Sequence, residues 1–380
     1  MCPVETFAQV GPGAGWPAIT TETLSWTPRA AFGEMTRRDQ AAQRETYEAA
    51  IAPAIASLDF APAQEVAAAA EDAATEIARF DAELGDEIAP FSAVLLRSEA
   101  AASSSIEQLT ASARSVALAE LGDHSKANAS LIAANTAAMR SAVSLVDNLD
   151  ADSLLQMHRT LMETADPIEA GRWRTQQVWI GGSSFGPTGA AYVAPHHERL
   201  PAAIDDLISY MKRDDIPVLT QAAIAHAQFE TIHPFTDGNG RTGRALIHVL
   251  LRRKGLTRNV TVPVSSGLLT DTDAYFEALT TYRQGDPEPI ILATANASFR
   301  AITNGRHLVA DLRRIRESWN ERIRARSHSA TWQIADLLIR QPVVNAKILN
   351  EELGIGPTHV RRHMDVLTAS GVTEPTQVYQ

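Results

Sequence analysis

Residues 219–254 constrain the fold of this chain more than any other stretch. Their first part carries apolar side chains at helical spacing on one stripe, and these are Ala222, Ala225, Phe229 and Ile232. Pro234 should end this helix. A second helix should run from about residue 240 to 254, with Gly255 as its C-terminal cap. The chain must therefore make a tight turn between two buried helices.

Most of the remaining chain also has a helix-forming composition, which predicts a mainly α protein. The clearest helical segments are 63–84, 103–121, 126–149 and 200–211. Residues 171–195 break the pattern, because two short β-prone runs at 177–180 and 190–193 flank a Gly-rich loop. They predict a β-hairpin, which must lie on the helical body because an isolated hairpin is only marginally stable.

The C-terminal part has a different charge. Residues 306–326 contain seven arginines against three acidic residues, a net charge of +4, and predict a helix. Three short helices should follow at 331–340, 345–353 and 357–370. This rhythm is typical of a winged helix-turn-helix. We therefore expect an N-terminal helical region at 1–125, a core at 126–304, and a linker helix with a winged helix-turn-helix at 305–380.

Composition limits the classes of function. The chain has 34 basic against 45 acidic residues and a formal charge of −11, which argues against a protein built mainly to coat nucleic acid. Cys2 is its only cysteine, so it cannot form an internal disulfide or a cysteine-based zinc site. We find no signal-peptide pattern and no apolar run long enough for a membrane span. We therefore expect a cytoplasmic protein without a membrane partner.

The tight turn has the features of an anion-binding site. Glycine at positions 238 and 240 permits φ > 0 and lets a phosphate approach the backbone. The helix that starts there directs its N-terminal N–H groups and its dipole at the same point. Arg241 and Arg244 are three residues apart, so their guanidinium groups can clamp two phosphates of a nucleotide.

Two further side chains complete this candidate site. The carboxylate of Asp237 can hold Mg²⁺ that bridges phosphate oxygens, and the imidazole of His233 can act as a general base for a hydroxyl nucleophile. Each feature has a structural alternative: Asp237 or Asn239 as a helix N-cap, His233 as a helix-end histidine, and the arginines as solvated surface. The spacing of Gly238 and Gly243 also fits a dinucleotide fingerprint, but no strand precedes it. The coincidence of these features within twelve residues favours a functional site.

Residues 233–244 resemble the signature of the Fic family, H-x-F-x-(D/E)-G-N-G-R-x-x-R, and match every fixed position. The similarity extends to residues 227–232, to the hairpin and to residues 275–289. The resemblance implies a Fic-type helical core with a hairpin flap. It also implies that the protein moves AMP from ATP to a Ser, Thr or Tyr hydroxyl of a protein, with Mg²⁺ as cofactor and release of pyrophosphate.

The resemblance assigns a role to each position of the motif. His233 deprotonates the target hydroxyl, and Asp237 binds Mg²⁺. Arg241 stabilises the charge on the β-phosphate, and Arg244 holds the γ-phosphate. Phe235 anchors the loop in the core. The anion hole, with the Asn239 side chain beside the α-phosphate, consists of Gly238, Asn239 and Gly240.

Two further sets of residues follow from the resemblance. The hairpin corresponds to the flap, which pairs with an extended target segment, and the alternative is a hairpin that only packs. The candidate target-binding residues are Val178, Trp179 and Ile180. The adenine pocket is expected at α-helical positions beyond the motif, where the alternative is that aromatic residues belong to the core. The candidate pocket residues are Tyr275, Phe276 and Arg283.

A second motif precedes the core. Residues 103–107, from Ser103 to Glu107, resemble the inhibitory motif (S/T)-x-x-x-E-(G/N) of Fic proteins with an N-terminal inhibitory helix. The resemblance implies that Glu107 pairs with Arg244 and occupies the position of the γ-phosphate. Residue 108 is glutamine instead of glycine or asparagine. Ser104 and Glu107 also fit a capping box, which is a purely structural device.

The sequence leaves three functions open. The first is an AMP transferase that is restrained by Glu107 and modifies another protein or itself. The second is a DNA-binding regulator whose core senses nucleotide, and the third is a related enzyme that removes AMP or moves another phosphate-linked group. The presence of His233 favours catalysis, because a sensor needs no base. ATP and a protein substrate are the expected partners, and a homodimer is a further hypothesis. DNA has weak support, because residues 330–380 carry a net charge of −1.

Overall fold

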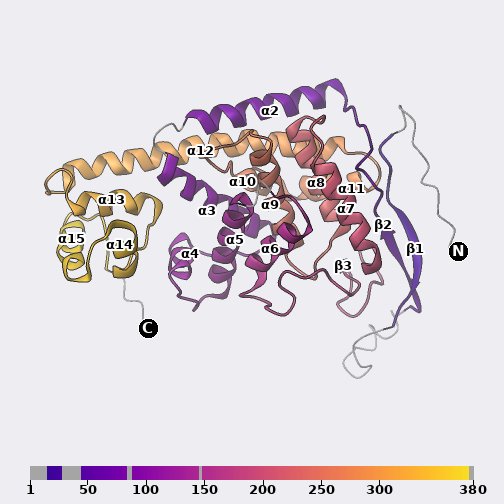
Figure 1. The fold of residues 1–380 in the computed structure, drawn as a ribbon, viewed down its shortest axis with the longest axis horizontal. Coiled ribbons are helices and arrows are strands. Elements are labelled where there is room, and N and C mark those ends of the chain that lie inside the picture. The colour runs from indigo at the N-terminus through magenta and orange to yellow at the C-terminus, as the bar shows by residue number, and fades with distance from the viewer. Residues whose placement is uncertain (1–14, 28–43, 84–87, 145–147, 376–380) are drawn as a thin grey trace.

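The computed structural model describes residues 15–27, 44–83, 88–144 and 148–375, and within them the chain is mainly helical, as expected (Figure 1). Cys2, Leu84 and residues 145–147 of the sequence-based predictions lie outside the described residues. The helices are α2 (Gln64–Glu83), α3 (Ile88–Ile106), α4 (Ala113–Glu120), α5 (Ala127–Ser144), α6 (Ala151–Met162), α7 (Leu200–Met211), α8 (Val218–Ile232), α9 (Asn239–Arg253), α10 (Val264–Leu268), α11 (Thr272–Arg283), α12 (Glu288–Arg322), α13 (Ala330–Arg340), α14 (Ala346–Leu353) and α15 (Pro357–Ala369). The 3₁₀ helices are η3 (His197–Arg199) and η4 (Leu269–Asp271), and the strands are β1 (Thr20–Ser25), β2 (Thr46–Ile51), β3 (Trp179–Ile180) and β4 (Tyr192–Val193).

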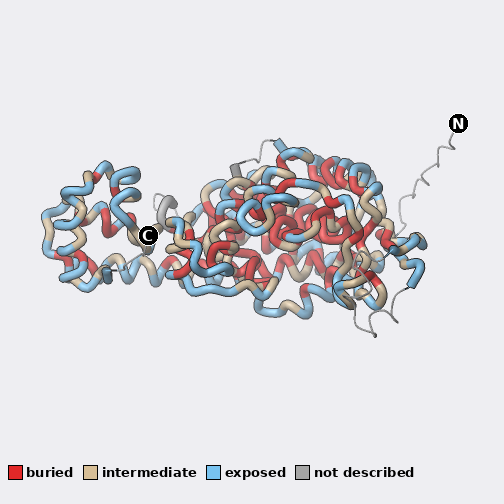
Figure 2. Tube along the Cα trace, turned by 90° about the horizontal axis from the view of Figure 1, so that it is seen from below, coloured by how far each residue is buried: buried red, intermediate tan, exposed pale blue. Residues whose placement is uncertain are grey.

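Helices α8 and α9 form the centre of the molecule, where buried residues are concentrated (Figure 2). Every residue of α8 from Leu219 to Ile232 is buried, and α8 packs against α2, α7, α9, α11 and α12. Its polar side chains are buried as well and need internal partners. Gln221 donates to the carbonyl of Tyr210 and Gln228 to that of Pro53, each at 2.8 Å. The predicted pair of buried helices is confirmed.

The prediction of one continuous helix over residues 103–121 is wrong, because two helices occupy this region. Helix α3 ends at Ile106, and α4 begins after Ser112, whose Oγ accepts a hydrogen bond from Ser115 N at 3.2 Å. Between them, Gln108 has a φ of 62°, the left-handed conformation that commonly terminates a helix. The break was not predicted because no glycine or proline marks it.

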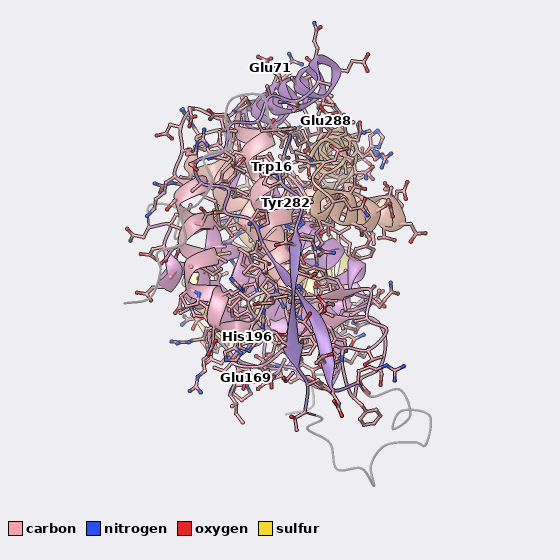
Figure 3. The ribbon with its side chains drawn as sticks, turned by 90° about the vertical axis from the view of Figure 1, so that its right-hand side faces the viewer. Trp16, Glu71, Glu169, His196, Tyr282 and Glu288 are labelled. Carbon is pink, nitrogen blue, oxygen red and sulfur yellow. The ribbon has the colours of Figure 1, made fainter. Side chains whose placement is uncertain are left out.

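The N-terminal region also contains an antiparallel ribbon that was not predicted. The ends of its register are Thr20 opposite Ile51 and Ser25 opposite Thr46. Figure 3 shows the ribbon along the side of the helical body, from the level of Trp16 and Tyr282 toward His196. Trp26, just after β1, contacts Trp179 of β3 edge-on, with ring centroids 5.5 Å apart. The ribbon therefore packs against the hairpin at 171–195.

Helix α12 is continuous across the predicted boundary at 304/305 and carries the chain from the core to the C-terminal module, α13–α15 (Figure 1). The module has its own apolar core, to which Trp319, Ile334 and Leu367 belong. Its three helices were predicted, but residues 370–375 after α15 contain no strand that could form a wing. Among the described residues, no helix combines the length and apolar character needed to cross a membrane.

Helix α3 connects the C-terminal module to the centre of the molecule. The guanidinium of Arg97, on α3, donates to both carboxylate oxygens of Glu120 on α4, with the shortest contact at 2.7 Å. It also donates to the carbonyl of Arg340 and, at 2.7 Å, to Oε1 of Gln341, at the end of α13. The C-terminal end of α3 lies at the tight turn between α8 and α9, where Glu107, directly after the helix, contacts two arginines of α9.

Candidate active site

The turn between α8 and α9 depends on two left-handed residues. His233 caps the C-terminus of α8 with φ 49° and ψ 61°, and its N–H donates to Phe229 O at 2.9 Å. Gly238 precedes α9 with φ 74° and ψ 8°. Left-handed backbone is costly for most L-residues but not for glycine, so position 238 requires glycine. The two residues fold the chain back so that His233 and the N-terminus of α9 share one site.

Asn239 and Phe235 hold this turn in place. The Asn239 amide accepts from Phe235 N and donates to Phe235 O, both at 2.9 Å. The Phe235 ring is fully buried and stacks on His158, with centroids 3.6 Å apart and planes 2° apart. Phe235 is therefore the anchor that was expected. The Asn239 side chain shapes the loop, because both of its polar atoms are already bonded to backbone.

His158 was not predicted as a site residue. Gly171 N donates to its Nδ1 at 3.0 Å, so its Nε2 carries the proton and donates to Asp237 O, also at 3.0 Å. Burial lowers the pKa of His158 to about 4, which keeps the ring neutral. The ring fixes the backbone of the residue expected to bind Mg²⁺. Sequence offered no signal for this role, since a histidine on an amphipathic helix usually belongs to the core.

Arg174 was also missed. Its buried guanidinium donates to four backbone carbonyls, those of His233 at 2.8 Å, Gln176 at 2.9 Å, Pro195 at 2.6 Å and Ile232 at 3.4 Å. It thereby satisfies a carbonyl at the C-terminus of α8 that has no partner within the helix. Arg174 joins the turn between α8 and α9 to both ends of the hairpin. An arginine before a Gly-rich hairpin gives no sequence signal for such a contact, and Arg172 stands only two residues away.

We expect Arg174→Met to lower the free energy of unfolding by about 2–4 kcal/mol, because it leaves buried carbonyls without donors. Urea denaturation measures this difference. Arg172→Met is the matched control, since Arg172 lies two residues away and is exposed. Its effect should stay within about 0.5 kcal/mol. Equal stability of the two variants would contradict the assigned role of Arg174.

Glu107 bridges the two arginines of the turn. Its Oε2 accepts from Arg241 Nε at 2.9 Å, and its Oε1 accepts from Arg244 Nη2 at 2.8 Å. Ser103 adds two contacts, because its Oγ accepts from Arg244 Nε at 2.9 Å and its carbonyl from Nη2 at 2.8 Å. The structure thus brings Glu107 to Arg244, as the resemblance implied. The contact with Arg241 was not foreseen.

The Glu107 carboxylate lies against the N-terminus of α9. A methyl group placed on Gly240 would collide with Oε1 of Glu107, so the carboxylate packs directly on the first turn of the helix. Helix N-termini attract anions through their free N–H groups and their dipole. Arg241 and Arg244 are almost completely buried, at 3% and 2% exposure. A carboxylate of the protein therefore occupies the position that was expected to bind phosphate.

The imidazole of His233 is neutral in the folded protein. Burial lowers its pKa to about 3, with Arg283 and Arg174 adding repulsion of the protonated form. Its Nδ1 lies 3.9 Å from Oε2 of Glu230, too far for a hydrogen bond. Burial raises the pKa of Glu230 to about 7. A neutral imidazole has a lone pair with which to accept a proton.

These shifts make stability depend on pH. Burial lowers the pKa of His226 to about 3, as for His233, and that of His158 to about 4, whereas an unfolded histidine titrates near 6.5. Between pH 6.5 and 4 the unfolded chain therefore binds more protons than the folded one at these three sites. Glu230, with a pKa of about 7, has the opposite sign between pH 7 and 4.5. The extra protons that the unfolded chain binds at three histidines outnumber the one proton that the folded chain binds at Glu230.

We therefore expect the free energy of unfolding to fall as pH decreases from 6.5 to 5, by at most about 2–3 kcal/mol per pH unit. Urea denaturation at pH 6.5, 6.0 and 5.0 measures the slope. Glu230→Gln removes the opposing contribution and should make the slope steeper. A free energy of unfolding that stays constant or rises over this range would contradict the neutral burial of the histidines.

The hairpin forms as predicted, with β3 and β4 paired at Trp179–Val193 and Ile180–Tyr192. Its three candidate target-binding residues have different environments. Val178 packs against a small apolar cluster that includes Ala50 of β2 and Tyr192 of β4, and Trp179 contacts Trp26. Ile180 is 40% exposed, so it is the candidate most accessible to a partner.

The three candidate adenine-pocket residues also differ in their burial and contacts. Tyr275 is buried on α11, and its hydroxyl lies 2.8 Å from Nε2 of His226 on α8. Arg283 lies over the ring of Tyr192, 3.9 Å from its centroid, and Nη2 of Arg283 donates to Glu230 O at 3.3 Å. Phe276 is 48% exposed. Tyr275 and Arg283 therefore contact α8, the helix that leads into the turn, whereas Phe276 is exposed.

Asp237 has the exposure that a metal ligand requires. Its side chain is 70% exposed, its Oδ1 accepts from Gly238 N at 2.7 Å, and its Oδ2 lies 3.6 Å from Arg241 Nη2. Mg²⁺ in nucleotide sites is usually held by one or two carboxylates together with phosphate oxygens and water. One open carboxylate beside an anion site fits this donor set.

Comparison with known proteins agrees with the geometry. Residues 148–251, which include the hairpin and the turn, match the model of the Fic/DOC family. Protein adenylyltransferase fic-1 of Caenorhabditis elegans is 34% identical over 159 residues, and protein adenylyltransferase Fic of Nematostella vectensis is 31% identical over 159 residues. Each match covers 41% of this chain but only 28% and 34% of these relatives. Glu107, Tyr275 and Arg283 lie outside the residues of the family match.

Solved structures share the fold. A Fic family protein from Desulfovibrio desulfuricans has a TM-score of 0.53 and 22% identity, covering 82% of this chain and 90% of that protein. A fragment of Fic-1 from C. elegans has a TM-score of 0.50 and 24% identity, covering 64% of this chain and 73% of the fragment. At these identities the similarity concerns the fold alone.

Proposed function

Because this chain contains a Fic domain, we propose that it is a protein adenylyltransferase, which moves AMP from ATP to a hydroxyl group of a protein. The observation that carries the proposal is the juxtaposition of three features at one turn. These are the N-terminus of α9, two buried arginines, and the neutral imidazole of His233. Together they supply an anion site, charge neutralisation and a base.

The transfer proceeds by in-line attack. The target hydroxyl oxygen bonds to the α-phosphorus of ATP, and the bond from that phosphorus to the oxygen of the β-phosphate breaks. The hydroxyl proton passes to the imidazole of His233, which is neutral before the reaction. Pyrophosphate leaves, and Arg241 and Arg244 stabilise its charge. Asp237 would hold Mg²⁺, which would neutralise further phosphate charge.

We further propose that Glu107 restrains the enzyme. Its carboxylate satisfies Arg241 and Arg244 and packs on Gly240, where the terminal phosphates of ATP would bind. Among the described residues, Arg241 Nη1 is buried without a hydrogen-bond partner. The Glu107 carboxylate therefore leaves one N–H donor of Arg241 without an acceptor, and a phosphate group has more oxygens that could accept from it. ATP must displace Glu107 before its phosphates can adopt the reactive position.

The target protein should bind as an extended strand along β3. A short strand with an open edge can pair with another chain through backbone hydrogen bonds. The exposed side chain of Ile180 would then contact the target, while Trp179 stays packed on the ribbon. Self-modification and modification of another protein both fit this geometry.

Labelled ATP tests the proposed reaction. We expect protein to become labelled by ATP that carries ³²P at the α-position and not by ATP that carries it at the γ-position. Phosphodiesterase should then release the label as AMP. The Glu107→Gly variant, incubated with cell lysate, provides the most sensitive assay. Labelling from the γ-position would instead indicate transfer of a terminal phosphate and would contradict the proposal.

A further inference from the structure

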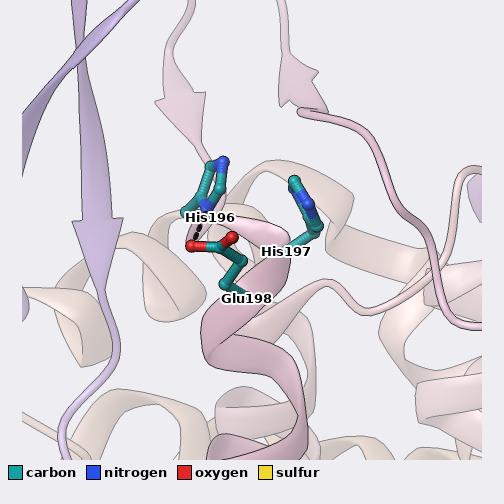
Figure 4. A group of neighbouring side chains, drawn as sticks. All are labelled: His196, His197 and Glu198. Atoms are coloured by element: carbon teal, nitrogen blue, oxygen red, sulfur yellow. Dashed lines mark ion pairs between the residues drawn. The ribbon is translucent and has the colours of Figure 1, made fainter.

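Three consecutive side chains at the base of the hairpin converge on one point (Figure 4). They are His196, His197 and Glu198, between β4 and α7. Their ligand atoms all lie within 4.8 Å of one another, and His196 Nδ1 is 3.6 Å from Glu198 Oε2. The two imidazole rings have centroids 4.1 Å apart. The three side chains are consecutive, so they belong to one turn of backbone.

We propose that His196, His197 and Glu198 bind a divalent transition-metal cation, with Zn²⁺ as the best fit. Two imidazoles and one carboxylate are an established donor set for Zn²⁺, with water in the fourth position. Tetrahedral coordination at about 2.1 Å places ligand atoms about 3.4 Å apart. The separation of His196 Nδ1 and Glu198 Oε2 is already close to this length. The wider separations close when a partly exposed side chain changes rotamer.

The chemistry of the cluster separates it from the magnesium ligand proposed at Asp237. Imidazole nitrogen suits Zn²⁺, Ni²⁺ and Cu²⁺, whereas Mg²⁺ prefers oxygen ligands and retains water. Glu198 is 80% exposed, so its carboxylate is accessible to a cation from solvent. The adjacent Arg199 is held by Glu22 on β1, at 2.7 and 2.8 Å. The proposed metal site does not depend on the proposed transfer of AMP.

The position of the cluster gives the cation a structural effect. Pro195, directly before His196, accepts through its carbonyl from Arg174, which also donates to the carbonyl of His233. A cation on the cluster ties the residues after β4 into one rigid turn. It therefore stabilises the base of the hairpin at the point where Arg174 connects the hairpin to the catalytic turn.

Zn²⁺ titration of untagged, chelator-treated protein tests the site, with a chromophoric chelator as competitor. A Cys2→Ser background removes the thiol as an alternative ligand. We expect one saturable Zn²⁺ per chain, no displacement by millimolar Mg²⁺, and at least about tenfold weaker binding by His196→Ala/His197→Ala and by Glu198→Gln. Zn²⁺ should also raise the melting temperature of the parent protein more than that of either variant.

The matched control is His307→Ala/His328→Ala, which removes two exposed histidines elsewhere. This variant should bind Zn²⁺ like the parent. The electronic spectrum of the Co²⁺-loaded parent should have the intense bands of tetrahedral coordination. Equal Zn²⁺ affinity of the parent and the His196/His197 variant, or displacement of Zn²⁺ by Mg²⁺, would overturn the proposal.

Discussion

Glu107→Gly is expected to raise the initial rate of AMP incorporation into protein by about 10- to 100-fold. The substitution removes two charge-assisted hydrogen bonds, each worth about 1.5–3 kcal/mol when buried. It frees Arg241 and Arg244 for the phosphates of ATP. Because tenfold corresponds to about 1.4 kcal/mol, release of only part of this energy suffices. Incorporation of label from α-³²P-ATP at sub-saturating ATP measures the change.

Gln108→Gly provides the opposite perturbation. Gln108 holds a left-handed φ of 62° directly after Glu107, which costs a non-glycine residue about 1–2 kcal/mol. Glycine removes this cost and so stabilises the end of α3. The contact of Glu107 with Arg241 and Arg244 should then be stronger, and the rate of AMP incorporation should fall below that of the parent. Equal rates for the parent and Glu107→Gly would show that the contact does not restrain the reaction. A rise with Gln108→Gly would contradict the role of the helix end.

In the Glu107→Gly background, His233→Ala is expected to reduce AMP transfer by about 10²- to 10⁴-fold, the usual contribution of a general base. ATP binding should be retained, because the proposed phosphate ligands belong to α9. Initial rates and ATP affinity, measured on the same preparation, distinguish the two effects. A loss of ATP binding would place His233 in the nucleotide site instead.

His233→Asn separates chemistry from backbone conformation. His233 is left-handed, and asparagine tolerates that conformation better than alanine but cannot act as a base at neutral pH. If His233 is the base, both variants should be equally inactive. Recovery of activity with asparagine would mean that the histidine serves only to shape the turn.

Sequence predicted the turn best where local chemistry determines structure. Pro234 and Gly238 mark the ends of two helices, and the predicted pair of buried helices was confirmed, although α8 is buried on every side and not only on its apolar stripe. Local sequence signals did not predict the helix ends that depend on contacts with residues distant in the chain. The helix at 103–121 breaks at Gln108, which has no compositional mark, and α12 continues through residue 304 because both of its halves pack on other elements.

The site divides in the same way. The resemblance gave the pairing of Glu107 with Arg244, but Arg241 shares that carboxylate only because α3 lies across the first turn of α9. Arg174 and His158 act through backbone atoms 59 and 79 residues away in the chain. No periodicity or motif encodes such contacts, since they depend on how the helices are assembled.

Through Arg97, the end of α13 and the proposed nucleotide site both contact the same element, α3 and the residue directly after it. Both act on α3, one near its middle and one at its end. If this proposed site binds ATP, a ligand of the module that prefers one position of α3 would change the ATP affinity by some factor, and ATP would change the affinity of that ligand by the same factor. Such couplings commonly amount to about 1–3 kcal/mol. The affinity of the module for such a ligand would then depend on the concentration of free nucleotide, and the effect would act through α3 in both directions.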